Sequence, residues 1–226
     1  MRAYIFGLIG LVFAAQVSAF SLSDLQQNPT GEGLKSMLEQ STQIAVAQLS
    51  QPGGFSNNPD VHIGLPGNLG KAARAMKMLG QGKQVTALEN SMNQAAEQAM
   101  PEAQALLLDA IKKMTISDAK GILAGPNDSA TAYLDRSSRE QLRSRFLPII
   151  TQATQSSGLA QQYNEFAGQA VNFGVIDAKD ASIENYVAEQ ALDGLFTIMA
   201  EQEASIRQDP AQAAGDVAKK VFQLLR

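Results

Sequence analysis

Two acidic residues, Glu189 and Asp193, give the strongest indication of chemistry in this sequence. They lie four residues apart, so in a helix they share one face, one turn apart. The flanking residues are apolar over most of the helical circumference, which predicts a central helix. Two carboxylates in such surroundings need a shared proton or a cationic partner, and could then act as acid and base or hold a hard metal ion. The competing interpretation is a solvent-facing stripe or an ion pair with a neighbouring helix.

The segment 51–67 is the second candidate, because its three prolines and four glycines exclude a continuous helix. Apolar residues alternate with period two over 61–65, which predicts a short extended piece. A long loop inside a compact domain is often functional, so we name Phe55 and His62 as candidate binding residues and expect the stretch around His62 to be the least constrained surface. The alternative is an Ω-type loop packed by its own apolar residues, without a site.

Basic residues follow this loop. Lys71, Arg74 and Lys77 fall within one sector of a predicted helix, where they could meet phosphate or lipid head groups. A second basic run covers 136–145. Charge on the exposed side of a helix is also the ordinary pattern of a soluble protein, so both runs keep a purely structural alternative.

The composition excludes several kinds of site. The chain has no cysteine and only one histidine, which excludes disulfide frameworks, thiolate zinc sites and sites with two histidine ligands. A formal net charge of -4 argues against a nucleic-acid partner. No nucleophile motif is present. We therefore expect no catalytic residue, metal or cofactor, and we favour a role other than catalysis.

The elements that must position these residues are helices. Apolar residues recur at helical spacing along most of the chain, which predicts an all-α, compact bundle of about nine to ten helices. Ser182 is the expected N-cap of the long helix that carries Glu189 and Asp193, and Ser138 with Gln141 the expected capping box of another. Pro148 should kink or divide that second helix. The expected helices cover residues 33–51, 69–79, 85–99, 101–114, 117–125, 138–156, 159–174, 182–208 and 210–225.

The N-terminus has the three-part layout of a secretory signal peptide. Met1-Arg2 is followed by an apolar run over 3–14 and by Val17-Ser18-Ala19, which predicts cleavage after Ala19. Residues 20–226 would then form a single exported helical domain. No later segment reaches the length of a transmembrane helix. An uncleaved N-terminal helix is the alternative.

Several sequence blocks together resemble a family of exported bacterial proteins, the domain of unknown function DUF4197. The blocks are PGGF at 52–55, LPGNLGKAA at 65–73, LGQGKQV at 79–85, PEAQALLLDAIKKM at 101–114, DAKGIL at 118–123, GLAQQYN at 158–164 and ALDGLF at 191–196. The resemblance covers most of the chain and implies a helical domain in the envelope of Gram-negative bacteria, in the periplasm. It brings no activity, cofactor or site residue with it.

These observations predict a periplasmic, non-enzymatic module of the cell envelope that binds a ligand or a protein. The partner is unknown, with an envelope lipid or protein as the expected class. One alternative is an envelope hydrolase or other enzyme that uses Glu189 and Asp193. The other is peripheral membrane association through the amphipathic C-terminal helix, where Lys219 and Lys220 border an apolar face.

Overall fold

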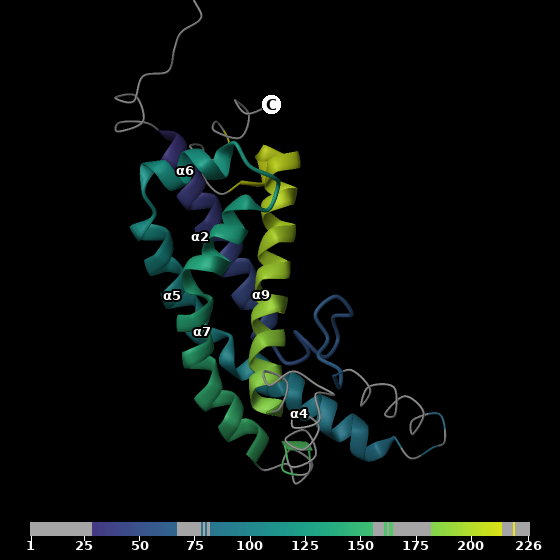
Figure 1. Cartoon of the computed structure of the whole chain (residues 1–226). Helices are drawn as coiled ribbons and strands as arrows, with labels where there is room; N and C mark the ends of the chain where they lie inside the picture. Colours follow the sequence, from purple (N-terminus) through teal and green to yellow (C-terminus); the bar gives the residue numbers. More distant parts are fainter. Residues whose placement is uncertain are drawn as a thin grey trace, which may run out of the picture.

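Helices form the whole regular structure of the described chain (Figure 1). The computed structural model describes residues 29–66, 82–155 and 182–213, with 78, 80, 161, 163, 164 and 219. The α-helices are α2 (Pro29–Leu49), α4 (Lys83–Ala99), α5 (Pro101–Lys113), α6 (Ile116–Leu123), α7 (Ser129–Gln155) and α9 (Ile183–Gln208), followed by the 3-10 turn η2 (Pro210–Gln212). The predicted all-α class is confirmed. No strand occurs among these residues, so the strand-like alternation over 61–65 does not lead to a sheet.

The described residues contain six α-helices rather than nine to ten. Helix α7 also differs from the helix expected over 138–156, because it begins at Ser129 and runs unbroken through both Ser138 and Pro148. Ser138 is only 2% exposed and donates its hydroxyl to the Leu134 carbonyl, so it does not cap a helix. Pro148 is exposed, and its ring removes a single helical hydrogen bond without dividing the helix. The helices expected over 69–79, 159–174 and 210–225 lie mostly outside the described residues.

Helix α9 is buried over much of its circumference, as its apolar residues predict. It packs against α2, α4 and α7, while α5 packs against α2 and α7 (Figure 1). The small buried residues Ala188, Ala191 and Gly194 allow close approach to its neighbours. Fully buried side chains from five helices form the core: Leu34, Met37, Leu38, Leu49, Met92, Leu107, Ile111, Leu134, Leu142, Phe146, Ile150, Val187 and Leu195.

The start of α7 is fixed by a buried carboxylate of α9. Glu203 is 0% exposed and accepts hydrogen bonds from Ala130 N at 3.0 Å and from Thr131 N and Oγ1 at 2.8 Å. Arg207 pairs with Glu203 at 2.9 Å and donates to the Ile122 carbonyl at the end of α6. The unpaired N–H groups of a helix N-terminus need such an acceptor. One ion pair therefore joins α6, α7 and α9.

Local end signals are confirmed at two other helices. The Ser182 side chain accepts a hydrogen bond from Asn185 N and caps α9, and Pro101 occupies the first position of α5. On α5, Asp109 and Lys113 form an exposed ion pair at 2.6 Å. That pair is a surface feature, as the helical spacing of the two residues indicates.

Candidate functional site

The loop after α2 is an ordered turn structure over residues 51–66. Gly53 has a positive φ of 89°, which a residue with a side chain rarely adopts. A Cβ at Gly54 would lie 2.5 Å from the Gln48 carbonyl oxygen, so only glycine lets the loop pass so close to the end of α2. Both glycines of the PGGF block are therefore required, Gly53 by its backbone conformation and Gly54 by its close contact with the end of α2.

The apolar side chains of the loop point into the protein. Phe55 is 0% exposed, Val61 7% and Ile63 1%, and Leu65 packs against the same core. Gly194 of α9 lies directly beneath Phe55 and Val61, because a Cβ there would be 2.7 Å from the Phe55 ring. Phe55 is therefore a core residue. The alternation of apolar residues over 61–65 reflects burial of the loop rather than a strand.

Helix α4 holds the loop backbone with a buried carboxylate. Glu97 is 7% exposed, and its Oε1 accepts hydrogen bonds from Gly53 N at 3.1 Å, Phe55 N at 3.2 Å and Ser56 N at 3.4 Å. Successive backbone N–H groups around a left-handed glycine make a concave site for an anion. Here the anion is a side chain of the protein itself.

A second polar side chain of α4 holds the other end of the loop. Asn93 is 0% exposed, accepts from Ile63 N at 3.0 Å and donates to the Ile63 carbonyl at 2.9 Å. Its amide thus pairs with Ile63 as a neighbouring strand would. From α9, the Tyr186 hydroxyl donates to the Gly64 carbonyl at 3.1 Å.

The outer side of the loop is polar. Asn57, Pro59, Asp60 and His62 are exposed, and the His62 ring has no hydrogen-bond partner among the described residues. The loop is thus more constrained than its glycine and proline content suggests, because three side chains from α4 and α9 bind its backbone. Its tip nevertheless remains accessible. Lys71, Arg74 and Lys77, predicted to lie beside it, fall outside the described residues.

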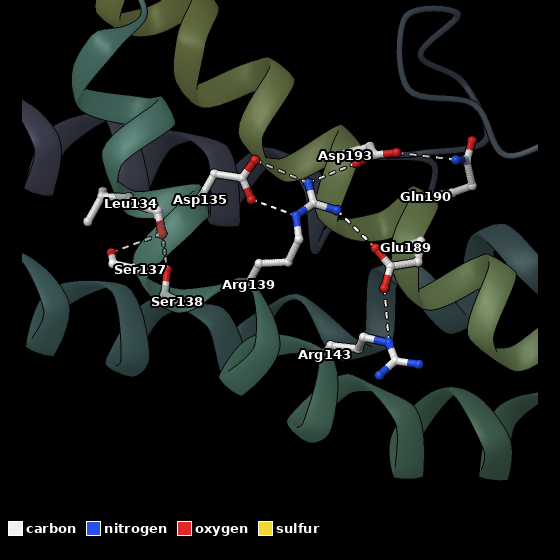
Figure 2. Close-up of polar contacts among 9 residues, drawn as sticks. All are labelled: Leu134, Asp135, Ser137, Ser138, Arg139, Arg143, Glu189, Gln190 and Asp193. Atoms are coloured by element: carbon white, nitrogen blue, oxygen red, sulfur yellow. Dashed lines mark hydrogen bonds and ion pairs between the residues drawn. The ribbon is translucent and has the colours of Figure 1, made fainter. Parts of the chain in front are cut away.

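The acidic pair of α9 meets two arginines of α7 (Figure 2). Arg139 lies between the two acids, at 3.0 Å from Glu189 Oε2 and 2.8 Å from Asp193 Oδ1, and Arg143 binds the other oxygen of Glu189 at 2.9 Å. Asp135 adds a third carboxylate to Arg139 at 2.6 Å. The cationic partner that the pair requires is therefore supplied by α7, and Arg139 and Arg143 are not simply a solvated basic face.

Arg139 is held as a cation. Partial burial disfavours its charge, but hydrogen bonds to Asp135 and Asp193 outweigh that effect and raise the pKa of its guanidinium further above its usual value. The guanidinium also lies 5.6 Å from the Phe196 ring centroid, in a cation–π contact. Asp193, with 55% of its side chain exposed, lines an open depression of about 350 Å³. Both acids serve here as acceptors in an ion-pair network that joins two helices.

Three important residues escaped prediction from the sequence. Asn93, Glu97 and Glu203 are buried polar side chains that bind backbone groups 30 to 73 residues away, and that distance hides them from the sequence. The available signal was weak: Asn93 and Glu97 lie one turn apart beside the apolar stripe of α4, where a surface position is equally plausible.

Comparisons with known proteins give a family and nothing further. A family model with the description "Protein of unknown function (DUF4197)" matches residues 24–223. No curated protein and no solved structure matches the chain. In the described part of the chain, no helix is long and apolar enough to cross a membrane, and no group of three acidic, histidine or cysteine side chains is arranged to hold a metal ion.

Proposed function

This chain belongs to the DUF4197 family of proteins of unknown function, and from that premise we propose that it is an exported, non-enzymatic module that binds another protein of the cell envelope. The binding surface is the exposed side of loop 51–66, with His62 and Asp60 at its centre. Export follows from the proposed signal peptide and cleavage after Ala19. The mature protein would act in the periplasm.

The observation that carries this proposal is the way α4 holds the loop. Glu97 and Asn93 are both buried, and together they make five hydrogen bonds to the loop backbone. Burial of polar groups costs free energy that a hydrogen bond only offsets, so an apolar helix face would stabilise the fold more simply. A loop fixed in one conformation loses little entropy when a partner binds it. This small entropy loss on binding is what a recognition surface needs.

The alternative functions have less support from the described residues. An enzyme using Glu189 and Asp193 would need a carboxylate that can exchange a proton, whereas arginines bind both acids. A lipid head-group site would depend on Lys71, Arg74 and Lys77. Membrane association would depend on the C-terminal helix. Those last two sets of residues lie almost entirely outside the described part of the chain.

Site-specific photocrosslinking in the source bacterium tests the proposal. A benzophenone amino acid replaces His62 in one variant and Gln104, an exposed residue of α5, in the matched control. We expect a discrete crosslinked protein from position 62 and none from position 104. Identical products from the two positions, or no product from position 62, would contradict the proposal. N-terminal sequencing of the periplasmic protein tests export separately, with Phe20 as the expected first residue.

A further inference from the structure

A groove lies between α6 and the first half of α7. Its volume is about 480 Å³, which is within the range of small-molecule sites. It shares Asp128 and Ala132 with the depression beside Arg139 but is otherwise lined by different residues. Loop 51–66 does not contribute to it, so it is a second site, independent of the protein-binding surface proposed above.

Two residues of opposite charge, Asp128 and Arg136, line this groove. Asp128, Ala132 and Arg136 are spaced i, i+4, i+8, and the Ala132 N–H donates to the Asp128 carbonyl, so helical geometry already holds at Asp128. Eight residues at 1.5 Å rise place the two charged residues about 12 Å apart along one ridge of α7. Both side chains are exposed, and neither forms an ion pair with a residue that the structure describes.

The acidic side chain on the α6 side of the groove already has its hydrogen-bond partners. Asp118 of α6 accepts hydrogen bonds from Thr115 N at 2.9 Å, Thr115 Oγ1 at 2.7 Å and the Tyr133 hydroxyl at 3.2 Å. Bonds from Thr115 lower the pKa of Asp118, while burial and the nearby carboxylate raise the pKa of Tyr133. The acid thus stays ionised and the hydroxyl stays protonated. Asp128 and Arg136 are left as the charges available to a ligand.

On the α6 side, Gly121 lines the groove. A Cβ at this position would meet no atom within 4 Å, and the residue is exposed on α6. This lining residue therefore places no side chain in the groove. Apolar contact is available from Ile122 and Pro126 in the same lining.

We propose that this groove binds a short peptide with free ends, its ammonium group at Asp128 and its carboxylate at Arg136. An extended tripeptide spans about 10 Å at 3.3–3.6 Å per residue, which is close to the separation of about 12 Å between the two positions along the helix. Carboxylate binding by a guanidinium and ammonium binding by a carboxylate are both charge-assisted hydrogen bonds. A ligand with one charged end would use only half of the site.

Titration of the isotope-labelled full mature chain with trialanine, followed by amide NMR shifts, tests the proposal. We expect shifts confined to residues lining the groove and a dissociation constant of about 1 mM or tighter. Arg136→Gln and Asp128→Asn should each weaken binding about ten-fold. Gly121→Leu should abolish it by filling the groove, while Gly31→Leu, at a position on α2 that is equally free of contacts, should not.

Peptides capped at one end show which protein residue binds which end of the peptide. Trialanine amide should bind the wild-type protein about ten-fold more weakly, and Arg136→Gln should bind trialanine and its amide equally, because the interaction is then already lost. N-acetyl trialanine should likewise bind the wild-type protein about ten-fold more weakly than trialanine does, and Asp128→Asn should bind trialanine and N-acetyl trialanine equally. Equal binding of free and capped peptides by the wild type would overturn the proposal, as would shifts outside the groove or no shifts at about 10 mM peptide. The crosslinking result at His62 is independent of these outcomes.

Discussion

Replacement of Glu97 by alanine is the sharpest test of how the loop is held. Three backbone N–H groups, of Gly53, Phe55 and Ser56, converge on one oxygen of this buried side chain. A typical intramolecular hydrogen bond contributes about 1 kcal/mol net, so three that share one oxygen contribute about 3 kcal/mol. We expect Glu97→Ala to lower the free energy of unfolding by that amount. Glu97→Gln keeps an acceptor and should cost about 1 kcal/mol.

Urea unfolding and amide hydrogen exchange together measure this effect. The matched control is Gln98→Ala, at the neighbouring exposed position of α4, which should change stability by less than about 0.5 kcal/mol. In Glu97→Ala the amide protons of residues 53, 55 and 56 should also exchange faster than the loss of global stability explains. If Glu97→Ala unfolds at the same urea concentration as Gln98→Ala, and these amides keep their protection, the carboxylate does not fix the loop.

Three further changes test the other contacts. Gly54→Ala places a Cβ 2.5 Å from the Gln48 carbonyl oxygen and should cost about 2 kcal/mol in urea unfolding, whereas Gly64→Ala, with no atom within 4 Å, is its near-neutral control. Glu203→Gln removes the buried negative charge that pairs with Arg207 and should cost about 3 kcal/mol; a cost below that of an exposed change such as Lys113→Gln would refute the role of Glu203. Because hydrogen bonds from Thr115 lower the pKa of folded Asp118, its stabilisation is complete above the unfolded pKa of about 4 and is lost as the pH falls below that value through the lower folded pKa. Asp118→Asn should therefore flatten part of the acid limb of the stability curve, and an unchanged limb would show that Asp118 contributes nothing to it.

Much of the fold follows from the sequence because helices are local structures. The apolar spacing of 183–208 predicts a helix that is apolar over most of its circumference and the Ser182 cap predicts its start, and the structure has a largely buried helix with that cap. Backbone hydrogen bonds within a helix join residues four apart, so the pattern that specifies them is read within a few turns. The same spacing identifies Glu189 and Asp193 as neighbours and indicates their need for a cation.

The tertiary structure decided which distant groups meet. The capping pattern at Ser138 is locally sound, but Glu203 binds the N–H groups of Ala130 and Thr131, 73 and 72 residues before it in the chain. Helix α7 therefore begins nine residues before Ser138 and runs through it. The glycines of loop 51–66 suggest freedom, yet Glu97 and Asn93 fix its backbone from another helix. Arg139 reaches Glu189 across fifty residues of chain. A buried polar group needs a hydrogen-bond partner, and the packing of whole helices determines which partner is near it. The spacing of residues within a single helix therefore does not predict that partner.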